Sequence, residues 1–345
     1  MSRRYDVIIA GASFAGLAVA SQLQGKKVLL IDHKEVGGNQ TSACGTLLYV
    51  AEALGLRDAV LQIHHKIYLH TDGKTFEYKL AYPTCTIDYK KFCQGFLDKA
   101  KKSEFKRANI LGLEGEMIKT DQGDFSAAFL IDASGWSASL GKHVDAKLID
   151  KNHLSFGLET EVAYKEEGLH FWYEPKFFKN GYLWLFPAGD MSRFGLGSYA
   201  GETQLKEKLM KFLDRFNLKI GDLYGGFLAT GSRPPVVGDV FLVGDAAGQC
   251  FPLTCEGIRP ALYFGIKLGQ IIQSASEKEI TLFEAKKLYR DFVLARKKYY
   301  RYALWAQKIL TSFPDWGVKT LASLVQEERV LAPAFRRYFE MARLP

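Results

Sequence analysis

The sequence predicts an α/β protein, in which a Rossmann-like dinucleotide-binding domain is interleaved with an antiparallel β-sheet domain and followed by a C-terminal helical segment. Three observations predict this class. A glycine-rich loop at residues 11–16 follows an apolar strand, and a second glycine cluster at 244–248 follows another. Between them, residues 153–199 form a strand-rich stretch with alternating aromatic residues.

The first 32 residues form the unit that a dinucleotide-binding loop requires. Residues 5–10, YDVIIA, are an apolar run typical of a buried parallel strand, and the glycine loop follows directly. Residues 15–23 are expected to form a helix, and residues 27–31, KVLLI, a second strand that ends at Asp32. Strand, loop, helix and strand in this order are the context in which such a loop binds a nucleotide.

The glycine loop is expected to hold a pyrophosphate. A tight turn that leads into a helix directs backbone N–H groups and the positive helix end at the phosphates. Gly11 and Gly16 permit close approach, and Ser13 replaces the middle glycine of the G-x-G-x-x-G pattern. Asp32 can accept hydrogen bonds from ribose hydroxyls, and it disfavours a 2′-phosphate. The candidate cofactor-binding residues are Gly11, Ala12, Ser13, Ala15, Gly16, Asp32 and His33.

The remaining elements alternate between the two predicted domains. Further strands are expected over 66–86, 108–131, 153–199 and 240–243, and helices over 88–102, 204–216 and 258–272. From about residue 282 the chain is predicted to be helical. The predicted domains are a cofactor-binding domain (1–67, 88–150 and 232–280), a substrate-binding sheet domain (68–87 and 151–231) and a C-terminal helical region (281–345).

Composition narrows the class of protein. With 345 residues, 48% of them hydrophobic and 24% charged, the chain has the composition of a globular protein with a large core. No apolar run approaches the ~20 residues of a membrane-spanning helix, and the first residues lead into a strand, so a cytoplasmic protein is expected. The five cysteines contain no C-x-x-C pair and the seven histidines no H-x-x-x-H pattern, so neither disulfides nor a metal site are expected.

The second glycine cluster points to FAD through a family resemblance. Residues 241–258, which contain GDAAG and further on a proline and a Gly-Ile pair, resemble the FAD-closing motif of the para-hydroxybenzoate hydroxylase-like flavoproteins. The resemblance implies that Asp245 binds the ribityl chain and that the following loop lies at the isoalloxazine ring. The implied cofactor-binding residues are Gly244, Asp245, Pro252, Gly257 and Ile258. An arginine commonly follows the position of Asp88 in this family, whereas this chain has Tyr89.

A second motif narrows the resemblance to the geranylgeranyl reductases. Residues 182–187, YLWLFP, and the GLG of 195–197 match the Y-x-W-x-F-P…G-x-G signature of that family, and Cys44-Gly45 resembles its Cys-Gly pair beside the flavin. Aromatic side chains on one face of a strand can line an apolar channel for a prenyl chain, although simple core packing is the alternative. The implied substrate-binding residues are Tyr182, Trp184, Phe186, Pro187, Gly195 and Gly197, and Cys44 and Gly45 are further cofactor contacts.

Cys44 is the candidate catalytic residue. Reduction of an isolated C=C bond requires a hydride from reduced flavin at one carbon and a proton at the other. A thiol with an unperturbed pKa of about 8.5 is protonated at neutral pH, so Cys44 can supply or relay that proton. The alternative is a small buried thiol that packs against the cofactor.

The resemblance therefore implies an FAD-dependent reductase that hydrogenates C=C bonds of a geranylgeranyl or other prenyl chain on a lipid, diphosphate, quinone or chlorophyll-type substrate. The main alternative is an FAD-dependent monooxygenase of the hydroxylase or halogenase type, although the halogenase W-x-W-x-I-P motif is absent. A non-catalytic flavoprotein that binds lipid is a third class. No second nucleotide loop for NADPH is visible, and an external electron donor, NAD(P)H or a ferredoxin-type protein, is expected.

The net charge of +8 is concentrated near the C-terminus, where residues 281–345 hold 13 Lys or Arg and 6 Asp or Glu. Aromatic residues interleave with the basic ones over 297–305. Such a region can stack nucleobases, lie at a lipid headgroup layer, or form a solvated helix with an apolar inner face. A lipid substrate favours peripheral contact with a membrane surface, and no nucleic-acid partner is expected.

Overall fold

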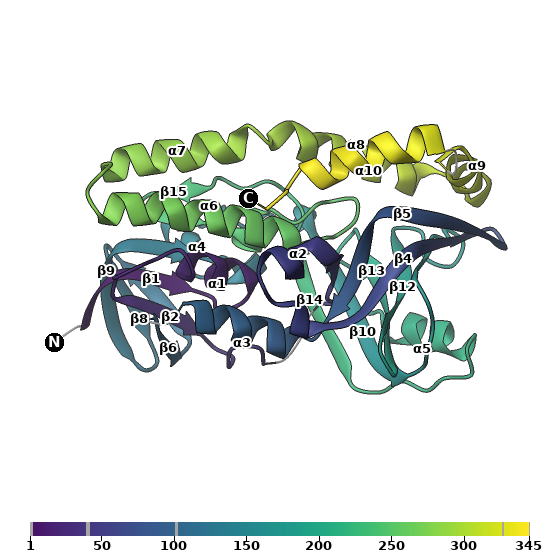
Figure 1. Ribbon diagram of the computed structural model, residues 1–345, viewed down its shortest axis with the longest axis horizontal. Coiled ribbons are helices and arrows are strands. Elements are labelled where there is room, and N and C mark those ends of the chain that lie inside the picture. Colours follow the sequence, from purple (N-terminus) through teal and green to yellow (C-terminus); the bar gives the residue numbers. More distant parts are fainter. Residues whose placement is uncertain (1–2, 39–41, 101–102, 326–327, 345) are drawn as a thin grey trace.

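The computed structural model of the protein describes residues 3–38, 42–100, 103–325 and 328–344. Two β-sheets lie along the long axis of the molecule, and a layer of helices runs across both (Figure 1). Helices α6 (Ile258–Ser276) and α7 (Leu282–Leu294) cover the first sheet. Helices α8 (Lys297–Ser312), α9 (Asp315–Val325) and α10 (Glu328–Glu340) continue the layer over the second sheet.

The first sheet has a parallel core. Its order is β15 (Val236–Val237), β16 (Val240–Leu242), β9 (Gly123–Asp132), β1 (Arg3–Ala10), β2 (Val28–Asp32) and β6 (Ser103–Arg107). Only the β15–β16 pair along this order is antiparallel, while β7 (Ile110–Glu114) and β8 (Met117–Thr120) extend the sheet beside β9 in antiparallel pairing. Because β1 lies between β2 and β9, the glycine loop that follows β1 is placed at the carboxyl edge of the sheet, where such folds bind ligands.

The second sheet collects strands from distant parts of the chain. Its order is β14 (Leu223–Ala229), β10 (Leu154–Ala163), β13 (Met191–Ser198), β12 (Gly181–Ala188), β11 (Leu169–Trp172), β4 (Val60–Thr71), β5 (Lys74–Ile87) and β3 (Gly45–Leu47). Every pair is antiparallel except β4 with β11, which are parallel. A parallel pair needs a long crossover, and here the chain passes through the first sheet between these two strands.

The predicted α/β class with two interleaved sheets is confirmed, and the differences lie at element boundaries. The strand expected from residue 66 begins at Val60, so the predicted boundary between residues 67 and 68 falls inside β4. Strands β3, β6 and β14 were not anticipated. Strand β3 has only three residues, too few for an alternating pattern to be visible in the sequence.

Small residues let helices α1 (Phe14–Ala20) and α6 approach closely. A Cβ on Gly265 would lie 2.8 Å from the carbonyl oxygen of Ala15, and one on Gly269 would lie 2.7 Å from that of Val19. The remaining helices of four or more residues are α2 (Leu48–Ala53), α3 (Tyr89–Lys99), α4 (Gly141–Val144) and α5 (Lys206–Asp214). The packing of α1 on α6 brings the first glycine loop beside the second glycine cluster.

The C-terminal helices are hydrogen-bonded to the residues that follow the second glycine cluster. The hydroxyl of Tyr300 donates to the carbonyl oxygen of Gln249 (2.7 Å), and the amide of Gln307 donates to that of Pro252 (2.7 Å). The fully buried Arg259 pairs with Glu256 and donates to the carbonyl oxygen of Phe339 at the end of α10 (2.8 Å). Within the described residues, no helix combines the length and apolarity needed to cross a bilayer.

Candidate functional site

The structure brings the two glycine clusters together in a tight cradle. Gly11 has φ +105°, and a Cβ there would lie 2.2 Å from the carbonyl oxygen of Ala133. A Cβ on Gly16 would lie 1.9 Å from the carbonyl oxygen of Gly11, and one on Gly244 would lie 2.9 Å from the Cβ of Ala15. These positions exclude side chains, because the glycine loop packs closely against the residues at Ala133 and against the second glycine cluster.

Asp32 at the end of β2 is tied to the same loop. Its carboxylate accepts hydrogen bonds from the backbone N–H groups of Ala12 (2.8 Å) and Lys34 (3.0 Å). The imidazole Nδ1 of the neighbouring His33 lies 3.1 Å from an Asp32 oxygen. The predicted ribose-binding acid and the predicted phosphate loop therefore lie in direct contact, as the strand–loop–helix–strand unit requires.

Tyr89 occupies the position at which the para-hydroxybenzoate hydroxylase-like flavoproteins, which the sequence resembles, commonly have an arginine. Its hydroxyl shares a hydrogen bond of 2.9 Å with Ser13 Oγ, and its ring contacts Phe14 edge to face with centroids 5.4 Å apart. Burial raises the pKa of Tyr89 well above its usual value, so the hydroxyl is neutral. The tyrosine thus holds the serine that replaces the middle glycine of the loop.

Asp245 lies half-buried where the second glycine cluster faces the loop of residues 252–258. A Cβ on Gly257 would lie 3.6 Å from Asp245 Oδ1, so these two predicted cofactor-binding residues are close together. Burial raises the pKa of Asp245 to about 6, although the nearby Arg233 opposes this. Arg233 also donates to the carbonyl oxygen of Trp136 (2.8 Å) and thereby fixes the turn behind the cluster.

The predicted aromatic motif forms one face of β12. Tyr182 and Trp184 have ring centroids 5.7 Å apart, and Trp184 and Phe186 have centroids 6.4 Å apart. Leu183 and Leu185, between them, point to the other face and are buried in the core that includes α5. The alternation predicted from the sequence is therefore present.

The G-x-G motif on β13 makes room for these rings. Trp184 is paired with Gly195, and Tyr182 with Gly197. A Cβ on Gly195 would lie 2.2 Å from the Trp184 ring, and one on Gly197 would lie 3.2 Å from the Tyr182 ring. The buried indole N–H of Trp184 has no hydrogen-bond partner in the described ranges. It is a buried donor without an acceptor among the described protein residues.

The Cys44-Gly45 pair lies at one end of the aromatic face. A Cβ on Gly45 would lie 2.7 Å from the Phe186 ring, so only glycine permits this approach. Cys44 is fully buried and has φ +53°, in the left-handed region that non-glycine residues rarely adopt. The predicted catalytic thiol and the predicted substrate-binding strand are thus neighbours.

Sequence reasoning missed Arg193, which anchors this pair. Its guanidinium, buried in β13, donates to the carbonyl oxygens of Ala43 (3.0 Å) and Ile87 (3.2 Å) and to Glu161 (3.0 Å). The N–H of Ile87 in turn donates to the carbonyl oxygen of Cys44 (3.0 Å). The signal available in the sequence was an arginine two residues before the G-x-G motif, since a charged residue in a buried strand needs specific partners.

The electrostatics keep the Cys44 thiol protonated. Burial raises its pKa to about 12, and the positive charge of Arg193 only partly opposes this effect. A buried thiol with a raised pKa is a poor nucleophile and a weak acid, which gives up its proton only to a strongly basic centre.

The other end of the aromatic face meets the loop of residues 252–258. The Tyr182 and Tyr199 rings have centroids 5.4 Å apart, and the Tyr199 hydroxyl donates to the carbonyl oxygen of Leu253 (2.7 Å). Cys255 also has a positive φ of +51°. The described residues include no cluster of His, Cys, Asp or Glu that could hold a metal ion.

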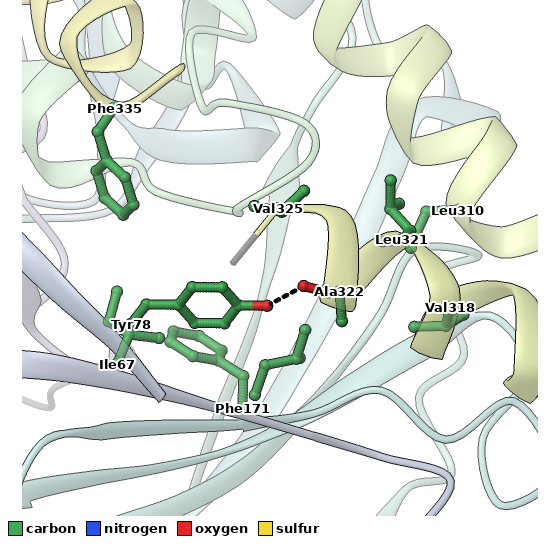
Figure 2. A pocket seen from close by; sticks show the side chains of 10 residues that line it. Ile67, Tyr78, Phe171, Leu310, Val318, Leu321, Ala322, Val325 and Phe335 are labelled. Carbon is green, nitrogen blue, oxygen red and sulfur yellow. Dashed lines mark hydrogen bonds between the residues drawn. The ribbon is translucent and has the colours of Figure 1, made fainter. Parts of the chain in front are cut away.

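An apolar pocket of about 290 Å³ extends the aromatic face under the C-terminal helices (Figure 2). The sheet contributes Ile67, Leu69, Tyr78 and Phe171, and the helices contribute Leu310, Val318, Leu321, Ala322, Val325 and Phe335. The polar atom of Tyr78 is satisfied, because its hydroxyl donates to the carbonyl oxygen of Ala322 (3.0 Å). Phe171 lines the pocket and contacts Phe186 with centroids 5.3 Å apart, so this ring belongs to both the pocket and the aromatic face.

This arrangement defines a class of protein. A parallel sheet with two glycine clusters at its carboxyl edge, joined to a largely antiparallel sheet with an aromatic face, is the two-sheet architecture expected for the para-hydroxybenzoate hydroxylase-like flavoproteins that the sequence resembles.

Comparisons with known proteins narrow the class. No model of a protein family matches the chain. The digeranylgeranylglycerophospholipid reductase 2 of Methanopyrus kandleri is 25% identical over 367 aligned positions, which cover 95% of this chain and 92% of that protein. The crystal structure of a geranylgeranyl bacteriochlorophyll reductase-like protein from Thermoplasma acidophilum matches with a TM-score of 0.84 at 20% identity, over 95% of this chain and 92% of that one. A myxobacterial FAD-dependent halogenase matches with a TM-score of 0.68 at 16% identity, over 99% and 91% of the two chains.

The chain is thus similar to geranylgeranyl reductases in sequence and, in fold, to a geranylgeranyl reductase-like protein. The resemblance predicted from the aromatic motif and the Cys-Gly pair is therefore confirmed, and so is the enzyme class.

Proposed function

We propose that the protein binds FAD across the carboxyl edge of the first sheet. In this proposal the glycine loop holds the pyrophosphate, Asp32 and His33 meet the adenosine ribose, Asp245 meets the ribityl chain, and the loop of residues 252–258 lies at the isoalloxazine ring. The glycine loop supports this assignment, because Gly11 and Gly16 leave no room for a Cβ in a strand-to-helix turn of the kind that binds a phosphate group. The described structural neighbour that is named FAD-dependent agrees with it.

The proposed reaction is the hydrogenation of C=C bonds in a geranylgeranyl chain that is carried by a glycerophospholipid. Bound FAD, once reduced by an external donor such as NAD(P)H or a ferredoxin-type protein, supplies the hydride. The chain's own residues must hold an apolar double bond and deliver one proton. The name of the Methanopyrus relative supports the choice of substrate.

This proposal depends on one observation, which is that the Phe186 ring lies between the Cys44-Gly45 pair and the apolar pocket. It lies against Gly45 on one side and contacts Phe171, which lines the pocket, on the other. A prenyl chain in the pocket could thus extend along the aromatic face as far as Cys44. Burial keeps the Cys44 thiol protonated, so it can give a proton to the carbon that does not receive the hydride.

The test compares Cys44→Ser and Cys44→Ala with Cys85→Ser, a variant of another fully buried cysteine outside the aromatic face. Each protein is reduced without oxygen and mixed with digeranylgeranylglycerophospholipid in detergent. Flavin reoxidation is followed by absorbance, and the lipid product by mass spectrometry. Wild type and Cys85→Ser should both reoxidise, while the Cys44 variants should be slower by about 10²–10⁴-fold. Equal rates in all four proteins would remove Cys44 from the proton transfer.

A monooxygenase is the second candidate, because the halogenase match shares the fold. The two functions separate in the same experiment. A reductase reoxidises with the lipid alone, whereas a monooxygenase requires oxygen and inserts an oxygen or halogen atom into its substrate. Reoxidation that occurs only in air, with an oxygenated product, would reject the reductase proposal.

We also propose that the protein meets its substrate at a membrane surface. A geranylgeranyl phospholipid resides in a bilayer, and the positively charged C-terminal region is suited to anionic headgroups.

A further inference from the structure

Helix α9 presents apolar side chains on two opposite faces. Val318, Ala322 and Val325, spaced three to four residues apart, line the pocket above the second sheet. Trp316 is 70% exposed, Leu324 is 56% exposed, and both lie on the solvent side of the helix. Large apolar side chains that stay exposed on one side of a helix can mark a binding surface. The outer face of α9 carries two of them, together with the polar Thr320 and Ser323.

Helix α8 adds positive charge and further aromatic rings. It contains Lys297, Lys298, Arg301 and Lys308 and no acidic residue. The salt bridges of the described residues include none made by these four side chains. Tyr302 is 61% exposed and Trp305 is 66% exposed. Lys298, Tyr302 and Trp305 have the i, i+4, i+7 spacing of residues on one helix face. Basic and aromatic side chains thus alternate on the outer face of α8.

From these observations we infer that the outer faces of α8 and α9 form one docking surface for an anionic lipid bilayer. The inference rests on the proposed function, since a lipid substrate gives the surface its purpose. Charge complementarity selects anionic headgroups, and Trp and Tyr rings beside Lys and Arg are the side chains that occupy the headgroup layer. An acidic protein would satisfy the charges but would leave the exposed apolar residues of α9 without a matching surface.

The position of the pocket agrees with this surface. The same helices that carry the exposed rings form the wall of the apolar pocket, as Figure 2 shows for Val318, Ala322 and Leu310. Leu321 lines the pocket and is itself partly exposed. A prenyl chain that left a bilayer docked on α8 and α9 would therefore enter a pocket whose wall these same helices form.

Sedimentation with vesicles tests the inference without any prenyl substrate. The full-length protein is mixed with vesicles of phosphatidylglycerol and phosphatidylcholine, and with vesicles of phosphatidylcholine alone. Two double variants, K298E/R301E and W305A/W316A, alter the surface. Their matched controls are K206E/K211E on α5 and F283A/L288A on the exposed side of α7. Circular dichroism confirms that each variant is folded.

Wild type and both controls should bind the anionic vesicles, and salt should weaken the binding. K298E/R301E should lower the partition coefficient at least about tenfold, and W305A/W316A should lower it on both kinds of vesicle. No binding by wild type, or equal losses in the α5 and α7 controls, would overturn the inference. Binding to polyglutamate but not to vesicles would also overturn it and assign the surface to an acidic protein.

Failure of docking and failure of the proposed function are distinguishable. If only docking fails, the enzyme still reduces the lipid in detergent. If only the proposed function fails, the protein still sediments with vesicles while no lipid is reduced.

Discussion

Arg193 donates a hydrogen bond of 3.0 Å to the backbone carbonyl oxygen of Ala43, the residue immediately before Cys44. The arginine belongs to the strand that carries the G-x-G motif, so the strand that shapes the aromatic face also holds the thiol loop. Its second acceptor is the carbonyl oxygen of Ile87 on β5. The N–H of Ile87 in turn donates a hydrogen bond to the carbonyl oxygen of Cys44. One buried guanidinium therefore couples three segments that are far apart in the sequence.

Arg193→Gln is expected to lower the free energy of unfolding by about 2–4 kcal/mol, because two buried carbonyl oxygens lose a charged donor. The released loop should also expose Cys44. A local loss of about 1.4 kcal/mol corresponds to a tenfold rise in the open population, so iodoacetamide labelling at pH 8 should be at least tenfold faster. Urea denaturation and peptide mass spectrometry measure the two effects.

Two variants serve as controls for this prediction. Arg193→Lys keeps the charge but lacks the rigid planar geometry of the guanidinium, so its labelling rate should be intermediate. Arg215→Gln removes a less buried arginine that pairs with Glu174, and should change stability by less than about 1 kcal/mol. Unchanged labelling of Cys44 in Arg193→Gln would show that the arginine does not position the loop.

Gly195→Ala should destabilise the protein by about 1–3 kcal/mol, because the new Cβ would lie 2.2 Å from the Trp184 ring and force it to move. Gly157→Ala is the matched control, since its Cβ would face the same ring at an ordinary 3.6 Å and should cost less than about 0.5 kcal/mol. Urea denaturation compares the two variants. Similar costs for both would mean that the ring is not confined as described.

Asp245→Asn should stabilise the FAD-free protein at pH 7.5. The folded-state pKa of about 6 lies above the usual value, so the folded protein binds a proton more readily than the unfolded chain and loses stability as pH rises through that window. Because the carboxylate is only half-buried, we expect a gain of about 1–2 kcal/mol at pH 7.5 that shrinks at pH 5. Urea denaturation at both pH values measures it, with exposed Asp222→Asn as the control.

The same Asp245 substitution should weaken FAD binding, measured by flavin fluorescence, if the carboxylate meets the ribityl chain. A gain in stability over wild type that is absent at pH 7.5 or equally large at pH 5, or normal FAD binding by the variant, would contradict the corresponding half of this prediction.

His64 should make the protein sensitive to acid. Burial lowers its pKa to about 4, so between pH 6.5 and 4 the unfolded chain binds a proton that the folded state does not. Stability is full above pH 6.5 and should fall by up to about 3 kcal/mol on acidification through that window. His64→Gln should flatten this part of the stability curve, measured by urea denaturation at several pH values. Exposed His143→Gln should leave the curve unchanged, and a steep slope in His64→Gln would assign the effect to other groups.

The sequence by itself determined the elements and motifs that local patterns encode. The apolar run of β1 followed by Gly11, the acidic end of β2 at Asp32, and the alternation along β12 are all visible because a strand or turn imposes its own period and turn residues. The family resemblance rested on these same local motifs, and the comparisons confirm it.

Only the tertiary structure decided how these motifs meet. Gly45 lies against Phe186, and Arg193 donates a hydrogen bond to the carbonyl oxygen of Ala43. The two residues of each contact are more than 100 positions apart in the sequence. The apolar pocket is built from three strands and three helices that no local pattern connects. Local periodicity reports which face of an element is apolar, whereas the partner of that face is set by long-range packing.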